Sequence, residues 1–161
     1  GKLTFSILMV CTGNICRSPM AEGLLSHLLP DSLKTRVRVS SAGTHGLHGN
    51  QAEPLAVKAA AAHGADISRH RARILNAGMI RSSDLVLAME QFHLDGINRL
   101  LIFRCKYARL LGEFAPQNEN PEIDDPYGFP FDAYETTAEA ILACIPRVIE
   151  HIQGQLVKKA S

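Results

Sequence analysis

The chain lacks several features that would place it in a specialised class of proteins. It has no tryptophan, only 6% aromatic residues, and four cysteines in 161 residues, too few for a disulfide framework. Its formal net charge of +1 provides no strong field for nucleic acid or an anionic membrane surface. No apolar run is long enough to cross a bilayer. These absences predict a globular protein of the reducing cytosol, with no nucleic-acid partner and no membrane insertion.

Signals for export and for metal binding are missing as well. The first residues, Gly1–Thr4, lack the charged lead and the cleavage site of a secretory signal. The sequence has no Cys-x-x-Cys pair and no His/Asp cluster with metal-ligand spacing, which argues against structural zinc. We therefore expect a protein that uses neither a metal nor a cofactor.

The order of apolar and polar blocks is typical of an α/β protein. The length fits one domain, 1–161, with a substantial core. Mostly apolar runs predict strands covered on both faces, as in a parallel sheet. The expected strands are 4–10, 36–42, 84–89 and 107–111, and the expected helices are 18–29, 53–63, 76–81, 90–104 and 134–153. Strands that alternate with helices assemble as a sandwich with a parallel sheet and right-handed crossovers.

Single residues predict details of two helices. Ser18 is placed as a capping hydroxyl in front of Pro19. Pro146, inside the last helix, removes one backbone hydrogen bond and is expected to bend it. The buried stripe expected on the first helix consists of Met20, Leu24, Leu25 and Leu28.

The stretch Val10–Pro19, VCTGNICRSP, lies between the first expected strand and the first expected helix. Five residues separate its Cys11 from the pair Arg17-Ser18. In an open parallel sheet, ligands bind beyond the carboxyl ends of the strands. Backbone N–H groups and the positive end of the next helix can surround an oxyanion there, and the guanidinium of Arg17 fits two phosphate oxygens. The stretch therefore predicts a phosphate-binding loop after strand 1.

Cys11 lies inside this positive cage, which favours the nucleophilic thiolate. Ser18 is positioned to donate a hydrogen bond to the thiolate and to stabilise it as a leaving group. Gly13 and Asn14 suit backbone angles that other residues resist. Together these residues predict an attack on phosphorus and a cysteinyl-phosphate intermediate that is formed and hydrolysed in two steps.

Such a reaction also needs an acid to protonate the departing oxygen. The expected loop 112–131 has four prolines and contains Asp124-Asp125-Pro126-Tyr127. A structureless loop of about 20 residues is uncommon in a compact domain and is often functional. Pro126 restricts the local backbone and can hold Asp125 over the site, where the same carboxylate could later activate water.

Each of these residues also has a simpler interpretation. A lone cysteine such as Cys11 is more often a small buried hydrophobe. Asp124 and Asp125 are typical turn formers before proline, His70 is typical of a solvated histidine, and Ser41 of a polar strand end. The combination of loop and acid in one mechanism favours the functional interpretation. A Walker-type loop is excluded, because the Gly-Lys-Ser/Thr sequence is absent.

Taken together, these motifs resemble the low-molecular-weight protein tyrosine phosphatases. Val10–Pro19 resembles the family signature, and Asp125-Pro126-Tyr127 resembles its general-acid motif near the C-terminus. Residues 40–44 (SSAGT), 70–73 (HRAR) and 87–90 (LAME) resemble further family segments, so the resemblance covers nearly the whole chain. It implies a three-layer α/β sandwich, with a four-stranded parallel sheet and helices on both faces.

The resemblance also implies a role for individual residues. Cys11 would be the nucleophile, Arg17 the phosphate ligand and Asp125 the general acid and base. Cys16 resembles a second loop cysteine that can form a reversible disulfide with Cys11. The implied support of the loop consists of Asn14, Ser41 and His70. The implied substrate-binding residues are Thr12, Gly13, Asn14, Ile15, Cys16, Ser18, Leu47 and Tyr127.

At two positions the chain departs from the general family pattern, and there it resembles the bacterial branch of the family. Leu47 stands where many members have an aromatic residue, and Gly128 follows Tyr127 where many have a second tyrosine. Bacterial members often act on tyrosine kinases of exopolysaccharide export. The resemblance therefore implies a phosphotyrosine protein as partner, such as a bacterial tyrosine kinase, and a phosphate or sulfate ion that binds in the loop.

Three other functions are compatible with this fold. Protein-arginine phosphatases resemble this loop but carry threonine where this chain has Ile15. Thioredoxin-coupled arsenate reductases need two further cysteines close together, whereas Cys105 and Cys144 are 39 positions apart. A non-catalytic phosphate-binding module would not need Cys11, Arg17 and Asp125 together.

Overall fold

The computed structural model describes residues 3–116 and 120–161. Its centre is a parallel sheet with the strand order β2-β1-β3-β4. The strands are β1 (Phe5–Cys11), β2 (Val37–Gly43), β3 (Leu85–Ala88) and β4 (Ala108–Leu110). Strands β3 and β4 fall within the predicted segments, and β1 and β2 are shifted from theirs by one residue. Because β1 is an inner strand, its carboxyl end has a neighbouring strand on either side.

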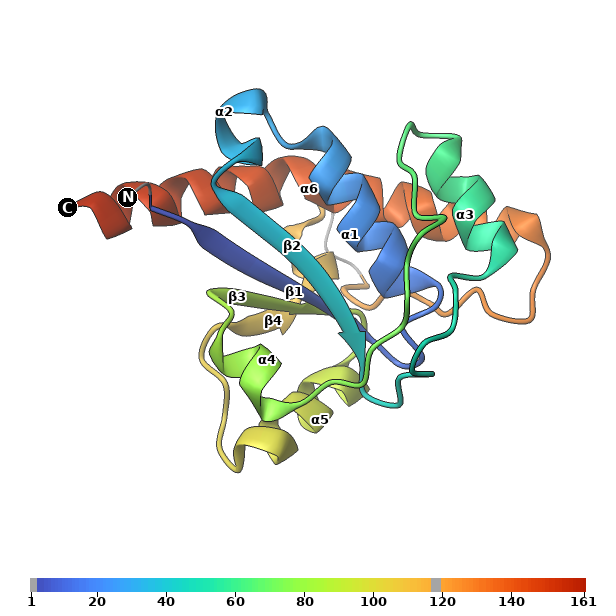
Figure 1. Cartoon of the computed structure of the whole chain (residues 1–161), viewed down its shortest axis with the longest axis horizontal. Helices are drawn as coiled ribbons and strands as arrows, with labels where there is room; N and C mark the ends of the chain where they lie inside the picture. Colours follow the sequence, from blue (N-terminus) through green and yellow to red (C-terminus); the bar gives the residue numbers. More distant parts are fainter. Residues whose placement is uncertain (1–2, 117–119) are drawn as a thin grey trace.

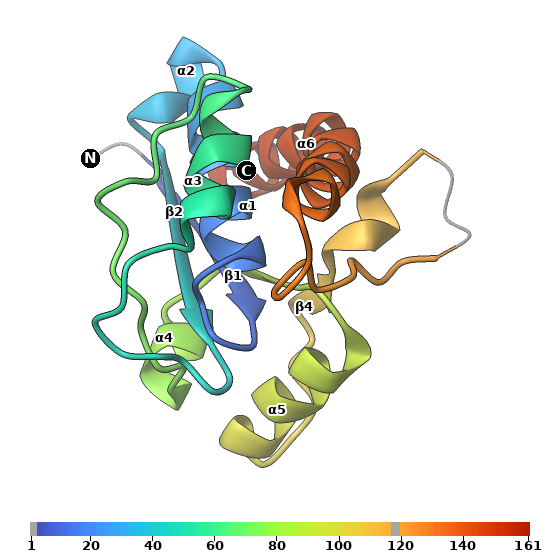
Figure 2. The same cartoon turned by 90° about the vertical axis from the view of Figure 1, so that its right-hand side faces the viewer.

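Helices cover both faces of this sheet, as expected. In Figure 1, α1, α3 and α6 lie above the sheet and α4 and α5 lie below it, and Figure 2 shows the same layers from the side. The helices are α1 (Arg17–Leu28), α2 (Asp31–Lys34), α3 (Pro54–Ala61), α4 (Ala77–Arg81), α5 (Gln91–Leu101) and α6 (Phe131–Ala160), with a 3₁₀ helix η1 (Leu111–Phe114). The three-layer α/β sandwich is thereby confirmed.

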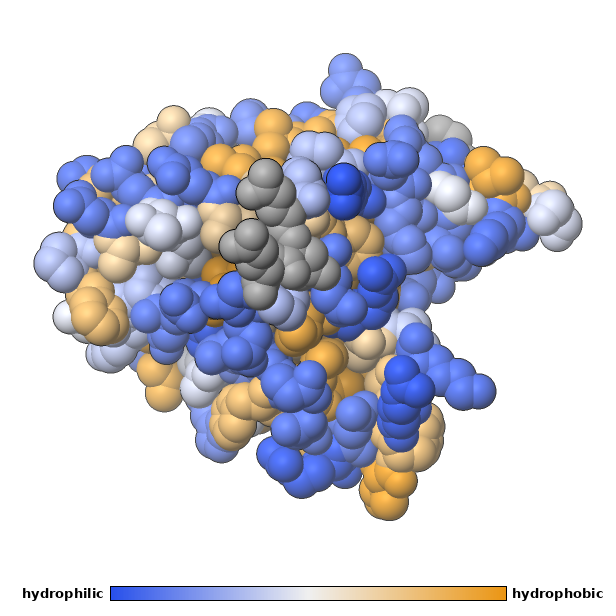
Figure 3. All heavy atoms as spheres, turned by 180° about the vertical axis from the view of Figure 1, so that it is seen from behind, coloured by the Kyte–Doolittle hydropathy of each residue, from blue (hydrophilic) through white to orange (hydrophobic). Residues whose placement is uncertain are grey.

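The side chains of β1 divide between two hydrophobic cores. Ile7 and Met9 pack with α1, α3 and α6, whereas Leu8 and Val10 pack with α4 and α5. All four are at most 1% exposed. This explains why β1 is continuously apolar instead of alternating, since a strand between two helical layers has no solvent face. From behind, the surface is mainly hydrophilic, with apolar side chains in separate patches (Figure 3).

Several predicted boundaries were wrong. Helix α6 extends beyond the predicted 134–153 at both ends, because a long apolar face holds it on the core, and Pro146 lies inside it, as predicted. Helix α5 ends at Leu101, since Ile102 adopts a left-handed conformation (φ 65°). Leu28 is 43% exposed and lies outside the buried stripe of α1. The short helix α2 was not predicted, and η1 occupies the start of the predicted loop 112–131, of which residues 117–119 lie outside the described residues.

One further finding concerns membranes. No helix among residues 3–116 and 120–161 combines the length and the apolar character that crossing a bilayer requires.

Candidate active site

The predicted phosphate loop connects the carboxyl end of β1 to the first turn of α1. Asn14 adopts a left-handed conformation there, with φ of 60°, as predicted. The same expectation for Gly13 was wrong, because only Gly49, Gly64 and Gly128 are left-handed among the described glycines. A Cβ on Gly13 would meet Leu47 and Ile15 at 3.5–3.6 Å, so the absence of a side chain leaves room beside these residues.

Ser18 does not cap α1, contrary to the prediction. Cys16 precedes the helix, and no side chain caps its first turn. The hydroxyl of Ser18 lies instead 2.8 Å from the sulfur of Cys11, and the Nδ2 group of Asn14 donates a hydrogen bond to it at 2.7 Å. Because Asn14 Nδ2 can only donate, the proton of Ser18 is left to donate to Cys11. The serine therefore serves the thiol rather than the helix end.

A chain of hydrogen bonds fixes the orientation of Asn14. Its Oδ1 accepts from the backbone N–H of Arg73 at 2.8 Å, and its second Nδ2 proton goes to Ser41 Oγ at 2.9 Å. Ser41 in turn donates to Glu22 Oε1 at 2.6 Å. His70 Nε2 lies 2.7 Å from the backbone oxygen of Asn14. Ser41 thus contacts the side chain of Asn14 and His70 contacts its backbone, while Glu22, which the sequence did not indicate, holds Ser41.

The side chains of Asn14 and Ser18 lie behind the loop. Both residues are 0% exposed. They were expected to bind substrate, but with buried side chains they can offer it only backbone N–H groups. The hydroxyl of Ser18 contacts Cys11, and the amide of Asn14 contacts both Ser18 and Ser41.

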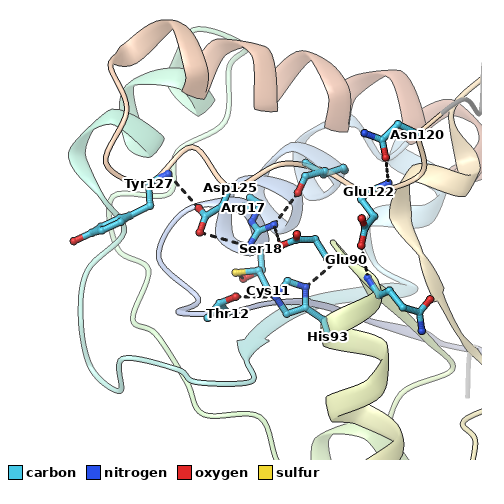
Figure 4. A network of polar contacts seen from close by, with 12 residues as sticks. Cys11, Thr12, Arg17, Ser18, Glu90, His93, Asn120, Glu122, Asp125 and Tyr127 are labelled. Atoms are coloured by element: carbon cyan, nitrogen blue, oxygen red, sulfur yellow. Dashed lines mark hydrogen bonds and ion pairs between the residues drawn. The ribbon is translucent and has the colours of Figure 1, made fainter.

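Arg17 is only 2% exposed and joins the loop to two other segments (Figure 4). Its Nη1 donates to Glu90 Oε2 at 2.6 Å and to the backbone oxygen of Ile123 at 2.7 Å. Its Nη2 lies 3.7 Å from Asp125 Oδ2. Glu90 was missed as a site residue. It follows β3, the neighbour of β1, so both strand ends meet at the same edge of the sheet.

The segment with the expected general acid is held against the end of β3. The backbone N–H of Ile123 donates to the carbonyl of Met89 at 2.9 Å, and Glu122 accepts from the N–H of Gln91 at 2.8 Å. Asp125, with a side chain 49% exposed, accepts from the N–H of Tyr127 at 3.1 Å. Asp125, rather than Asp124, is therefore the carboxylate beside Arg17.

A cavity of about 340 Å³ opens above the thiol. Most of the expected substrate-binding residues line it, with Leu47 and Tyr127 exposed at its rim. His45 lines it as well and stacks on Phe92 with 5.8 Å between the rings, a pair that sequence reasoning missed. The lining residues are Cys11, Thr12, Gly13, Ile15, Cys16, Arg17, His45, Leu47, Asp125 and Tyr127.

Cys16, the second loop cysteine, is buried and differs electrostatically from a nucleophile. Burial raises its pKa to about 12, although a contact with the hydroxyl of Tyr134 at 3.7 Å opposes the shift. Cys16 therefore stays a neutral thiol at physiological pH.

No group of three or more His, Cys, Asp or Glu side chains suited to a metal ion occurs in the described part of the chain.

A thiol at the end of an inner parallel strand, an arginine and a carboxylate around one cavity define a cysteine-based phosphate-loop site. Residues 6–159 match the family described as low molecular weight phosphotyrosine protein phosphatase. The chain belongs to this family.

Comparison with individual proteins agrees with this assignment. The chain is 43% identical over 130 residues to the low molecular weight protein-tyrosine-phosphatase Etp of Escherichia coli (strain K12), covering 81% of this chain and 82% of Etp. The crystal structure of the tyrosine phosphatase Wzb from Escherichia coli K30 with sulphate is similar, with a TM-score of 0.82, 31% identity and coverage of 93% and 99%. The YwlE arginine phosphatase from Geobacillus stearothermophilus is also similar, with a TM-score of 0.83, 32% identity and coverage of 96% for both chains.

Proposed function

We propose that the protein hydrolyses phosphotyrosine in proteins through a cysteinyl-phosphate intermediate, without a metal ion. The observation that carries the proposal is the convergence of Cys11, Arg17 and Asp125 on one cavity. The apparent alternative, a non-catalytic phosphate-binding module, gives no reason for a carboxylate opposite the thiol.

In the first proposed step, the Cys11 thiolate attacks phosphorus in line with the tyrosyl oxygen. The S–P bond forms, the P–O bond to the aryl group breaks, and the carboxyl group of Asp125 gives its proton to the departing oxygen. The backbone N–H groups of the loop and the guanidinium of Arg17 stabilise the charge on the phosphoryl oxygens. The ion pair with Glu90 holds this guanidinium in place.

In the second proposed step, water attacks the phosphorus of the cysteinyl phosphate. Asp125, now a carboxylate, takes a proton from this water, and the S–P bond breaks to release inorganic phosphate. The hydrogen bond from Ser18 stabilises the departing thiolate, because the contacts of Asn14 leave the serine proton for the sulfur. Inorganic phosphate is the product and is expected to occupy the same loop. The similar Wzb structure is a complex with sulphate.

The cavity walls favour an aryl phosphate as substrate. Ile15, Leu47 and Tyr127 give the cavity apolar sides that a tyrosine ring can contact. Phosphoarginine is a second candidate substrate, because the chain is also similar to the YwlE arginine phosphatase. We favour phosphotyrosine because this chain has the apolar Ile15 at the loop position where protein-arginine phosphatases carry threonine.

Arsenate reduction is disfavoured by the positions of the remaining cysteines. Cys105 belongs to the core under α5, whereas Cys144 belongs to the core under α6. The sheet lies between these two cores, so the two thiols cannot relay a disulfide.

The proposed partner is a tyrosine-phosphorylated protein, such as a bacterial tyrosine kinase of an exopolysaccharide pathway. Similarity to Etp and Wzb supports a bacterial phosphatase of this kind. We place the enzyme in the reducing cytosol, because Cys11 has to stay reduced in order to act as nucleophile.

The proposal is tested with purified protein and four substrates: phosphotyrosine, phosphoserine and phosphoarginine peptides, and arsenate. Phosphotyrosine should be turned over fastest, in the presence of a chelator, and Cys11→Ser should abolish turnover. Asp125→Ala should lower the rate about 10²–10⁴-fold, and Asp124→Ala far less. Turnover that a chelator stops, or a larger loss with Asp124→Ala, would contradict the mechanism.

A further inference from the structure

His93 makes an unexplained connection between helix α5 and the phosphate loop. Its side chain is 0% exposed, and its Nε2 lies 2.8 Å from the hydroxyl oxygen of Thr12, which lines the cavity (Figure 4). Its Nδ1 accepts the backbone N–H of Glu90 at 3.1 Å, as part of the capping box of α5. One imidazole thus spans the helix start and the residue after the nucleophile.

These two contacts determine where the imidazole proton resides. The N–H of Glu90 can only donate, so Nδ1 of His93 must be the unprotonated nitrogen. Burial and the nearby Arg17 lower the pKa of His93 to about 4, so the ring is neutral and its proton lies on Nε2. His93 is therefore the donor and Thr12 Oγ1 the acceptor.

The direction of this hydrogen bond leaves the hydroxyl proton of Thr12 unused. Within residues 3–116 and 120–161, the Thr12 hydroxyl has His93 as its hydrogen-bonding partner. The residue lines the cavity next to Cys11, where a phosphate ester would bind. If His93 had the other tautomer, the proton of Thr12 would point to the imidazole and away from the cavity.

We propose that His93 is a positioning residue that turns the hydroxyl of Thr12 into a hydrogen-bond donor to the phosphoryl group. This inference rests on the proposed function, because it assigns one more donor to that reaction. The donor adds to the backbone N–H groups of the loop and stabilises charge on the phosphoryl oxygens. Thr12 acts on the substrate directly, and His93 acts only through Thr12.

The test compares four variants on an aryl phosphate. Thr12→Val removes the hydroxyl at nearly constant shape and should lower kcat/KM about tenfold, whereas Thr12→Ser retains the hydroxyl and should lose clearly less kcat/KM than Thr12→Val. His93→Leu should lower kcat/KM by a similar factor. His93→Gln should restore most of the activity, since its amide offers both an acceptor for Glu90 and a donor for Thr12.

The double variant separates positioning from a structural effect. In the Thr12→Val background, His93→Leu should cause no further loss of kcat/KM, because no hydroxyl is left to orient. His93→Leu also removes part of the capping box of α5, and the resulting decrease in Tm should be equal in the wild-type and Thr12→Val backgrounds. An equal loss of kcat/KM in both backgrounds, or an unchanged rate for Thr12→Val, overturns the inference alone. A wild-type protein without aryl phosphate turnover overturns the proposed function and the inference with it.

Discussion

The guanidinium of Arg17 donates to the carboxylate of Glu90 at 2.6 Å, across 73 residues of sequence. The Arg17 side chain is 2% exposed and that of Glu90 is 33% exposed, so water screens the pair only in part. A buried arginine without a counter-charge is costly. The position of the expected phosphate ligand therefore depends on the residue that follows β3.

Replacing Glu90 should destabilise the protein more than replacing a surface partner. Glu90→Ala leaves the buried Arg17 without its closest carboxylate and is expected to lower the free energy of unfolding by about 2–3 kcal/mol. Urea denaturation measures this loss. Added phosphate should recover part of it, because the anion supplies the missing negative charge.

The matched control is Glu113→Ala. Glu113 lies 4.0 Å from Arg109, and both side chains are about 40% exposed. Such pairs contribute about 0.2–1 kcal/mol. Glu113 Oε2 also accepts the backbone N–H of Leu110 at 2.8 Å, which adds about 1 kcal/mol. The control should therefore lose less stability than Glu90→Ala. An equal decrease in the free energy of unfolding for the two variants would show that the Arg17–Glu90 pair stabilises the protein no more than a surface pair.

Gly43 should be essential for the shape of the phosphate loop. A Cβ at this position would lie 2.2 Å from the backbone oxygen of Thr12 and 3.0 Å from the backbone nitrogen of Asn14. Gly43→Ala must therefore displace the loop backbone and should abolish most of the turnover. Gly154→Ala is the control, since its Cβ meets nothing within 4 Å in helix α6. The control should keep full activity and gain up to about 1 kcal/mol in stability. Comparable activity of both variants would refute the steric argument.

His93 should make stability depend on pH in the acid range. Its pKa is about 4 in the folded protein, below its usual 6.5, so the unfolded chain binds the proton first as the pH falls. The contribution is fully present above pH 6.5 and is lost as the pH falls towards 4. Allowing for partial screening, we expect about 1–3 kcal/mol.

The difference between wild type and His93→Gln isolates this effect from the other histidines. Chemical denaturation at pH 7, 6, 5 and 4 should give a steeper loss for the wild type, because glutamine does not titrate. Parallel curves for the two proteins would mean that His93 is protonated in the folded state at the same pH as in the unfolded chain.

Peroxide should inactivate the enzyme reversibly. In the proposed site Cys11 is the reactive thiolate, whereas the raised pKa of Cys16 keeps its thiol neutral, so Cys11 should be oxidised first. The sulfenic acid can then condense with Cys16, and mass spectrometry of digested protein should detect the Cys11–Cys16 disulfide. Reductant should restore activity in the wild type but less completely in Cys16→Ser, which lacks the protecting thiol. Equal recovery of both proteins would exclude a protective role for Cys16.

The sequence was sufficient to predict those parts of the site whose residues are close together in the chain. Cys11, Asn14 and Arg17 lie within one short loop, and the left-handed conformation predicted for Asn14 was confirmed. The expectation for Gly13 was wrong, because residue type gives only a preference for a backbone angle. Ser18 fitted a capping position equally well, and only its contact with the sulfur of Cys11 revealed the use of its hydroxyl.

By itself, the sequence determined the α/β architecture, the phosphate loop and the candidate acid, because apolar runs, turn residues and a compact motif express short-range physics. Only the tertiary structure decided that Glu90, Ile123 and His93 join the site. These residues depend on the pairing of β1 with β3, which brings together strand ends that are distant in the chain. Sheet pairing is a cooperative outcome of core packing, and no local pattern around Glu90 or His93 encodes which strand end they will meet.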